Sequence, residues 1–116
     1  MYFMKIKDIV AGENYNSLQL YRQGVFWVGY EQSAYVLWLY KRYKVSVRYI
    51  KSLKRAVLSV GFADSVLDEV GILYQKDEAK STSVYKNFIL KESVDRTSFF
   101  DWRLKMTHTR GWARQL

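Results

Sequence analysis

The chain has 116 residues, of which 49% are hydrophobic and 17% aromatic, and it carries a formal net charge of +8. This apolar content excludes a disordered chain, and the length favours one domain that buries a core without a disulfide or metal. The absence of cysteine excludes thiolate metal sites and a disulfide framework. The strong positive charge points to polyanionic partners.

The N-terminal run MYFMKIKDIV contains the first expected element. Lys5, Lys7 and Asp8 interrupt it before the apolar core of a secretory signal can form. No later stretch reaches the roughly 18 apolar residues of a membrane span. We therefore expect a cytoplasmic protein without a membrane partner. The spacing of the apolar residues predicts a short helix over residues 5–14 that stops near Gly12.

The following segment is expected to form two strands and a helix. Residues 18–22 and 25–28 are β-prone, and Gly24 provides a turn between them. Residues 30–43 place apolar side chains at three-to-four spacing, which predicts a helix. Residues 45–49 then alternate apolar and polar side chains, as a half-buried strand does.

The next part of the chain predicts a hairpin followed by a helix and a last strand. Residues 55–60 are expected to pair with the preceding strand and to end at Gly61. Asp64 or Ser65 can then cap a helix, and residues 84–90 have the composition of a strand. Together these elements predict a single α/β domain whose mixed β-sheet has helices packed on it.

The C-terminal segment differs from this domain in composition. We assign residues 1–95 to the α/β domain and residues 96–116 to a basic, aromatic C-terminal tail. The tail can form an amphipathic helix with three apolar side chains on one side, or remain a flexible basic arm that orders only on binding. The apolar side chains of the helical alternative are Phe99, Trp102 and Met106.

Positive charge is concentrated in residues 41–55, KRYKVSVRYIKSLKR, which contain seven basic residues and no acidic one. Tyrosines are interleaved with them. Cations that attract phosphates, together with rings that stack on bases, are typical of a nucleic-acid-binding surface. The alternative is an ordinary solvated surface with half-buried tyrosines. The basic residues are Lys41, Arg42, Lys44, Arg48, Lys51, Lys54 and Arg55.

Few residues of the chain suggest catalysis. With one histidine and no cysteine, Cys-His pairs and the common zinc sets are excluded. Asp64, Asp68 and Glu69 could hold a divalent metal in a nuclease. The same carboxylates can simply favour the positive end of the helix that begins there, which is the commoner role. We therefore expect no cofactor, no bound metal and no enzymatic activity.

Two runs of the sequence carry a family resemblance. In LQLYRQGVFWVGYEQSAYVLWLYKRYKVSV an aromatic-Arg-x-Gly turn precedes a short aromatic strand and an alanine-bearing helix, and in LSVGFADSVLDEV a Gly-Phe pair leads from a strand into a helix. These blocks, over roughly residues 16–75, resemble the N-terminal, mismatch-recognition domain of MutS DNA-repair proteins. The matching positions are Tyr21, Arg22, Gly24, Phe26, Trp27, Ala34, Gly61 and Phe62.

The resemblance implies a fold like MutS domain I and a DNA contact made by an aromatic side chain. The two flanking glycines would turn the chain so that Phe26 or Trp27 projects against a base. The glutamate with which the family bonds that base is replaced by Val28, so this hydrogen bond is lost unless Glu31 substitutes for it. The alternative is that both aromatic side chains lie in the core, on opposite faces of the strand.

Stand-alone MutS-like domains of this size are known as accessory proteins beside the reverse transcriptase of diversity-generating retroelements in bacteria. The favoured hypothesis is thus a non-enzymatic accessory protein that binds DNA or RNA through the basic residues of 41–55, with a reverse transcriptase as its protein partner. A different hypothesis is a protein-docking or homo-oligomerisation module anchored by Trp102 and Trp112, because tryptophan is enriched at the energetic centres of interfaces.

Overall fold

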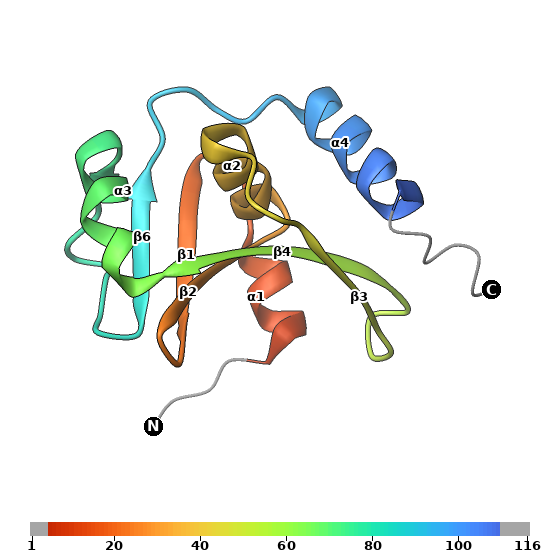
Figure 1. Ribbon diagram of the computed structural model, residues 1–116, viewed down its shortest axis with the longest axis horizontal. Helices are drawn as coiled ribbons and strands as arrows, with labels where there is room; N and C mark the ends of the chain where they lie inside the picture. Colours follow the sequence, from red (N-terminus) through yellow and green to blue (C-terminus); the bar gives the residue numbers. More distant parts are fainter. Residues whose placement is uncertain (1–4, 110–116) are drawn as a thin grey trace.

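The computed structural model describes residues 5–109, which form one six-stranded sheet and four α-helices (Figure 1). The strands lie in the order β3-β4-β2-β1-β6-β5. The elements in chain order are α1 (Ile6–Gly12), β1 (Ser17–Gln23), β2 (Phe26–Tyr30), α2 (Gln32–Lys41), β3 (Ser46–Ile50), β4 (Arg55–Ala63), a 3-10 turn η1 (Asp64–Val66), α3 (Leu67–Leu73), β5 (Gln75–Lys76), β6 (Tyr85–Ile89) and α4 (Arg96–Thr109).

The strand pairings define the fold class. The predicted α/β domain with helices packed on one sheet is confirmed. Where mixed strand directions were expected, all pairings within the described residues are antiparallel. Short turns over residues 24–25 and 51–54 join β1 to β2 and β3 to β4, and turns this short can only connect antiparallel neighbours.

One face of the sheet carries the main core. Trp27, Leu58 and Phe88 point from three different strands to this face, and each is at most 1% exposed. Helices α2, α3 and α4 cover them and add residues such as Leu37 and Val70 to the same cluster. Alternate residues of each strand point this way because side chains in a strand alternate between the two faces.

The two glycines that flank the Phe-Trp pair have different structural roles. Gly24 has φ +62°, the left-handed conformation that the turn between β1 and β2 requires, as predicted. Gly29 instead lies beneath α2, where a Cβ would stand 3.1 Å from Ser33 Cβ and 3.2 Å from Leu37 Cδ1. A side chain here would press against α2, so glycine allows the helix to lie this close to β2.

The opposite face of the sheet is covered only in part. Ile9 of α1 packs on Tyr21, Tyr30 and Val57, which form a second, smaller cluster. Figure 1 shows α1 on the side of the sheet away from α2 and α4. Because α1 has only seven residues, it covers the middle strands and leaves the area toward β3 and the β1–β2 turn open.

The segment predicted as a C-terminal tail belongs to the domain over its described length. Residues 96–109 form α4, and Phe99 and Trp102 lie in the main core at 3% and 4% exposure. The helical alternative is confirmed, and the flexible-arm alternative is wrong for these residues. The boundary at 95/96 therefore marks the start of a helix and does not separate the core from a tail.

Two local predictions in the middle of the chain are wrong. Strand β4 does not end at Gly61 but continues to Ala63, because Phe62 is buried against the helices and extends the sheet pairing with β2. Asp64 does not cap the following helix with its side chain. Its Oδ1 instead accepts a hydrogen bond of 2.6 Å from Trp27 Nε1.

Candidate functional site

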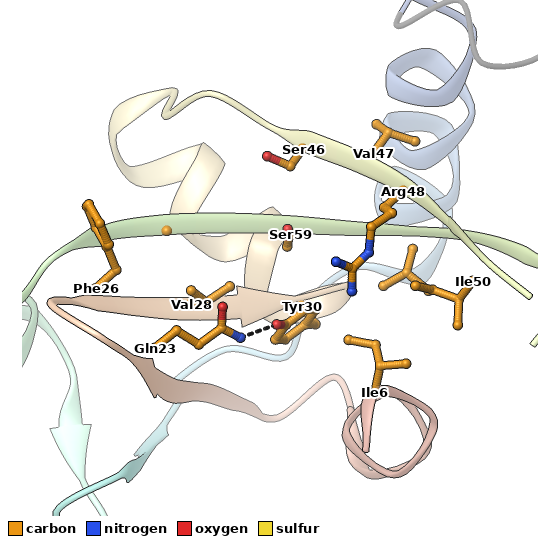
Figure 2. A pocket seen from close by; sticks show the side chains of 12 residues that line it. Ile6, Gln23, Phe26, Val28, Tyr30, Ser46, Val47, Arg48, Ile50 and Ser59 are labelled. Atoms are coloured by element: carbon orange, nitrogen blue, oxygen red, sulfur yellow. Dashed lines mark hydrogen bonds between the residues drawn. The ribbon is translucent and has the colours of Figure 1, made fainter. Parts of the chain in front are cut away.

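The open part of the second sheet face contains a groove of about 600 Å³ (Figure 2). Strands β2, β3 and β4 form its floor, and Ile6 of α1 contributes to one wall. In the described part of the chain, its lining combines apolar side chains with uncharged polar groups and one cation, and contains no carboxylate. The aromatic and polar side chains are Gln23, Phe26, Tyr30, Ser46, Arg48 and Ser59.

Arg48 gives the groove its positive charge. It lies on the edge strand β3, opposite Val57 of β4, and Figure 2 shows its side chain reaching across the groove toward Tyr30. Within residues 5–109 its guanidinium has no ion-pair or hydrogen-bonding partner. A guanidinium presents several N–H donors in a planar fork that suits phosphate or carboxylate oxygens. The groove is therefore suited to an anion.

Phe26 and Trp27 point to opposite faces of β2. Phe26 lines the groove and is 50% exposed. Trp27 is 1% exposed in the main core, and its indole N–H donates a hydrogen bond to Asp64. Of the two predicted base-contacting residues, only Phe26 is accessible. The prediction that Trp27 contacts a base is wrong, because a base could reach its ring only if the core opened.

The predicted basic residues fall into two groups, and the first is occupied within the domain. Lys41 Nζ lies 2.6 Å from Glu69 Oε2, and this contact lowers the pKa of the Glu69 carboxyl. The guanidinium of Arg42 stacks 4.0 Å from the centre of the Trp38 ring and donates to the Trp38 carbonyl. Both residues stabilise the end of α2, where basic residues favour the negative end of the helix dipole.

The second basic group lies along β3 and its turn. Lys44 precedes the strand, Arg48 lies within it, and Lys51 and Lys54 occupy the turn to β4; all four side chains are exposed. No ion pair holds any of them in the described part of the chain. Arg55 differs, because its Nη1 lies 3.4 Å from Glu31 Oε1. We call these four exposed cations the hairpin cluster.

Glu31 is a structural residue whose role the sequence did not reveal. It is 3% exposed, accepts a hydrogen bond of 2.9 Å from the Leu58 backbone N–H, and lies 2.8 Å from Arg103 Nε. Arg103 also donates to the Ala56 carbonyl, so the pair fixes α4 to β4. Glu31 is thus not available to bond a base in place of the missing glutamate. Its two arginine partners lie far from it in the sequence, and no local pattern identifies them.

The tryptophans predicted to anchor a partner do not form an exposed docking pair. Trp102 packs against Tyr35 and Phe99 inside the domain. The prediction that Trp102 anchors a partner is therefore wrong, because the ring is already buried within the domain. Trp112 lies outside the described residues.

The three carboxylates considered for a metal site do not converge. Asp64 bonds Trp27 and lies 3.5 Å from Arg22. Glu69 is held by Lys41 and Tyr40. Over residues 5–109, no group of three or more His, Asp or Glu side chains is arranged to hold a metal ion. Asp64 and Glu69 thus have structural partners within the domain.

A buried carboxyl lies away from the groove, between α1 and α2. Glu13 Oε1 accepts hydrogen bonds from the Ser33 backbone N–H at 3.0 Å and from Ser33 Oγ at 2.8 Å. Its Oε2 is buried and has no partner among the described residues. Burial raises the pKa of this carboxyl to about 8, although the bonds from Ser33 oppose the shift.

Four polar residues of the groove were not among the predicted site residues: Gln23, Tyr30, Ser46 and Ser59. The period-two alternation along the strands could have identified them, because they share a face with Phe26 and Arg48. It could not have shown that this face is left open. That depends on the length and position of α1.

No family model matches the sequence, and no curated protein or solved structure gives a significant match. No helix within residues 5–109 is long and apolar enough to cross a membrane. The activity of the chain must therefore be inferred from the shape, charge and chemistry of the groove and the hairpin cluster.

Proposed function

We propose that this chain is a non-enzymatic nucleic-acid-binding accessory protein that uses the groove together with the hairpin cluster. One observation carries the proposal: within residues 5–109, an accessible aromatic ring, Phe26, and an unpaired guanidinium, Arg48, line the same groove without a carboxylate in its lining. Aromatic rings that stack on bases and cations that neutralise phosphates are the two components of interfaces that bind single strands without sequence preference.

The charge distribution supports the same class of partner. Lys51 and Lys54 extend the positive charge of Arg48 around the β3–β4 turn. The chain as a whole carries a net charge of +8. Phosphates bound by such cations release condensed counterions, so the affinity should fall steeply as salt is added.

The resemblance of residues 16–75 to the MutS N-terminal domain is consistent with this proposal, and the setting it implies is an accessory role beside a reverse transcriptase. Mismatch reading by the family's glutamate is not part of the proposal. Val28 stands at that position, and Glu31 is held by Arg103 and the Leu58 backbone.

The proposal is tested by fluorescence anisotropy with labelled single-stranded DNA, duplex DNA, mismatched duplex and RNA at several salt concentrations. The test variant is the double charge reversal Arg48→Glu/Lys51→Glu. The matched control is Lys80→Glu/Lys91→Glu, which reverses two exposed cations beside the β5–β6 end of the sheet. Each variant lowers the net charge by the same amount, so any difference between them reports position.

We expect wild type to bind at least one of these nucleic acids with an affinity that falls as salt rises. Arg48→Glu/Lys51→Glu should weaken binding at least tenfold and reduce the magnitude of the salt slope by about one for each phosphate that is no longer neutralised. The control should retain most of the affinity. Equal losses of affinity in both variants, or no binding by wild type at low salt, would contradict the proposal.

A second candidate function, self-association, is favoured by the outer face of α4. Phe100 and Leu104 are 54% and 60% exposed and lie four residues apart, so they share one side of the helix. If two copies meet there, Phe100→Asp/Leu104→Asp should convert a dimer into a monomer in light scattering. A wild-type chain that is monomeric at high concentration would exclude this function.

A further inference from the structure

We infer that the groove binds an unpaired strand of nucleic acid, with one base stacked on Phe26 and a backbone phosphate held by Arg48. This inference rests on the proposed function and adds the strand state of the ligand and the residues that contact it. It distinguishes a single strand or an extruded base from an intact duplex.

The shape of the site favours an unpaired base. Proteins that read intact duplexes insert a protruding helix or β-ribbon into a groove of the nucleic acid. Here Phe26 and Arg48 line a hollow on the sheet face, bounded by α1 on one side (Figure 2). Its volume of about 600 Å³ lies within the range of sites that enclose small ligands, roughly 300–1,000 Å³. A paired base would have to leave its stack to enter it.

The length of the groove indicates more than one nucleotide. Phe26 and Tyr30 lie at the two ends of β2 on the same face, a separation of roughly 13 Å at the rise of an antiparallel strand. Arg48 is on β3, and strand β4 separates β3 from β2 in the sheet. The base on Phe26 and the phosphate at Arg48 therefore belong to different nucleotides of one strand. A few nucleotides fill the groove.

The polar groups that line the groove between Phe26 and Arg48 are suited to contact bases and sugars. Tyr30 and Gln23 are hydrogen-bonded to each other in the groove. Their remaining donor and acceptor capacity, with the hydroxyls of Ser46 and Ser59, can meet base edges or sugar hydroxyls. Between Phe26 and Arg48 the lining is an uncharged mixture of apolar and polar side chains. One accessible aromatic platform in such a lining favours broad recognition, because every base has a face that can stack.

Charge selects this ligand over a neutral or cationic one. Among the described residues, the groove is lined by the unpaired guanidinium of Arg48 and by no carboxylate. The lysines of the hairpin cluster lie just before and just after β3, whose residues line the groove. An acidic peptide would also satisfy Arg48. A nucleic acid fits the groove better, because its backbone supplies regularly spaced anions and its bases can stack on Phe26.

The test uses variants that alter the groove without changing the net charge. Gly61 lies on the groove face opposite Val28, and a Cβ there would be 3.4 Å from Val28 Cγ2 and 3.5 Å from the Trp27 carbonyl oxygen, which are ordinary contacts. Gly61→Leu should fill the groove, and Gly61→Ala is its control. Phe26→Leu removes the ring and Phe26→Trp retains one, while Val25→Ala alters an exposed neighbour that does not line the groove.

Anisotropy titrations compare a short single strand, the same sequence as a duplex and an acidic peptide at one low salt concentration. A strand carrying 2-aminopurine, whose fluorescence falls on stacking, reports stacking directly. We expect the single strand to bind at least tenfold more tightly than the duplex. Phe26→Leu and Gly61→Leu should weaken single-strand binding about 5- to 100-fold, as loss of one stacked base does. Phe26→Trp should restore the stacking that Phe26→Leu loses, and Gly61→Ala should weaken binding less than Gly61→Leu does. Val25→Ala, outside the groove, should remain close to wild type.

Three results would overturn the inference. They are duplex binding as tight as single-strand binding, unchanged affinity in Phe26→Leu, and binding of the acidic peptide alone. The first two can occur while Arg48→Glu/Lys51→Glu still loses affinity, in which case the proposed function stands and only the strand assignment fails. If the wild-type protein binds no nucleic acid at all, the proposed function and the strand assignment both fail. Should Gly61→Leu not fold, as judged by circular dichroism, the Phe26 variants decide.

Discussion

The two faces of this sheet are made from the same strands but differ in how far helices cover them. Three helices seal one face, and its large side chains, Trp27 and Phe88 among them, are almost fully buried. One short helix covers part of the other, which leaves Phe26 half exposed beside an unpaired arginine. Consecutive residues of one strand thus have opposite environments. Stability is concentrated on the covered face, and the groove face remains available for binding.

The comparison is tested first by truncating the buried member of the aromatic pair. Trp27→Ala should lower the free energy of unfolding by about 3–5 kcal/mol, the usual cost of removing a large buried ring. It also leaves the Asp64 carboxylate without its indole donor. Chemical denaturation measures the change. A loss below about 1 kcal/mol would mean that the covered face does not carry the stability we assign to it.

The second test concerns the attachment of α4 to the covered face. Arg103→Met removes the closest cation from the buried Glu31 carboxylate, and we expect a loss of about 2–4 kcal/mol because a buried charge loses its main partner while Arg55 remains. Lys105→Met, at an exposed position of the same helix, is the control. Tryptophan emission should shift to the red only in Arg103→Met. Equal stability of the two variants would argue against a structural ion pair.

The third test uses pH to probe the contact that joins α1 to α2. Because burial raises the pKa of Glu13 from 4.5 to about 8, the folded state retains a proton that the unfolded chain releases. This contribution to stability is complete below pH 4.5 and is lost as the pH rises to about 8, by on the order of 1 kcal/mol per pH unit. Glu13→Gln should flatten that slope. A wild-type profile that is level across this window would refute the assignment.

The smallest expected change in stability comes from the exposed member of the aromatic pair. Phe26→Ala should lower the free energy of unfolding by less than about 1 kcal/mol, because half of the ring already contacts water. The same variant should bind single strands more weakly. Denaturation and anisotropy on one preparation measure both. A large loss of stability would place Phe26 in the core and remove the contrast with Trp27.

Much of the secondary structure could be predicted because its signals are local. A β-prone composition located β1 and β6, alternation of apolar and polar residues located β3, and three-to-four spacing located α2 within a few residues at each end. Strand β4 was predicted too short, since Gly61 suggests an end, whereas burial of Phe62 continues the pairing. The two-residue strand β5 has no sequence signal of its own and depends on β6.

The candidate site was predicted only in part, for a physical reason that particular residues illustrate. Phe26 and Arg48 were both singled out, yet nothing in the sequence placed them in one groove, because strands β2 and β3 are separated by β4 in the sheet. Lys41 and Arg42 were grouped with Arg48 by proximity in sequence. In the structure Lys41 contacts Glu69 of α3 and Arg42 stacks on Trp38, so these two cations are already engaged at the end of α2.

By itself, the sequence determined that this chain folds as an α/β domain, that it is strongly basic, and that an aromatic pair lies on one strand, since composition and periodicity depend only on neighbouring residues. The tertiary structure decided which aromatic is buried, which cations remain unpaired and where the groove lies. Those outcomes depend on contacts between distant segments, such as Glu31 with Arg103 and α1 with the middle of the sheet. Local patterns do not encode the order of the strands or the extent to which a helix covers them.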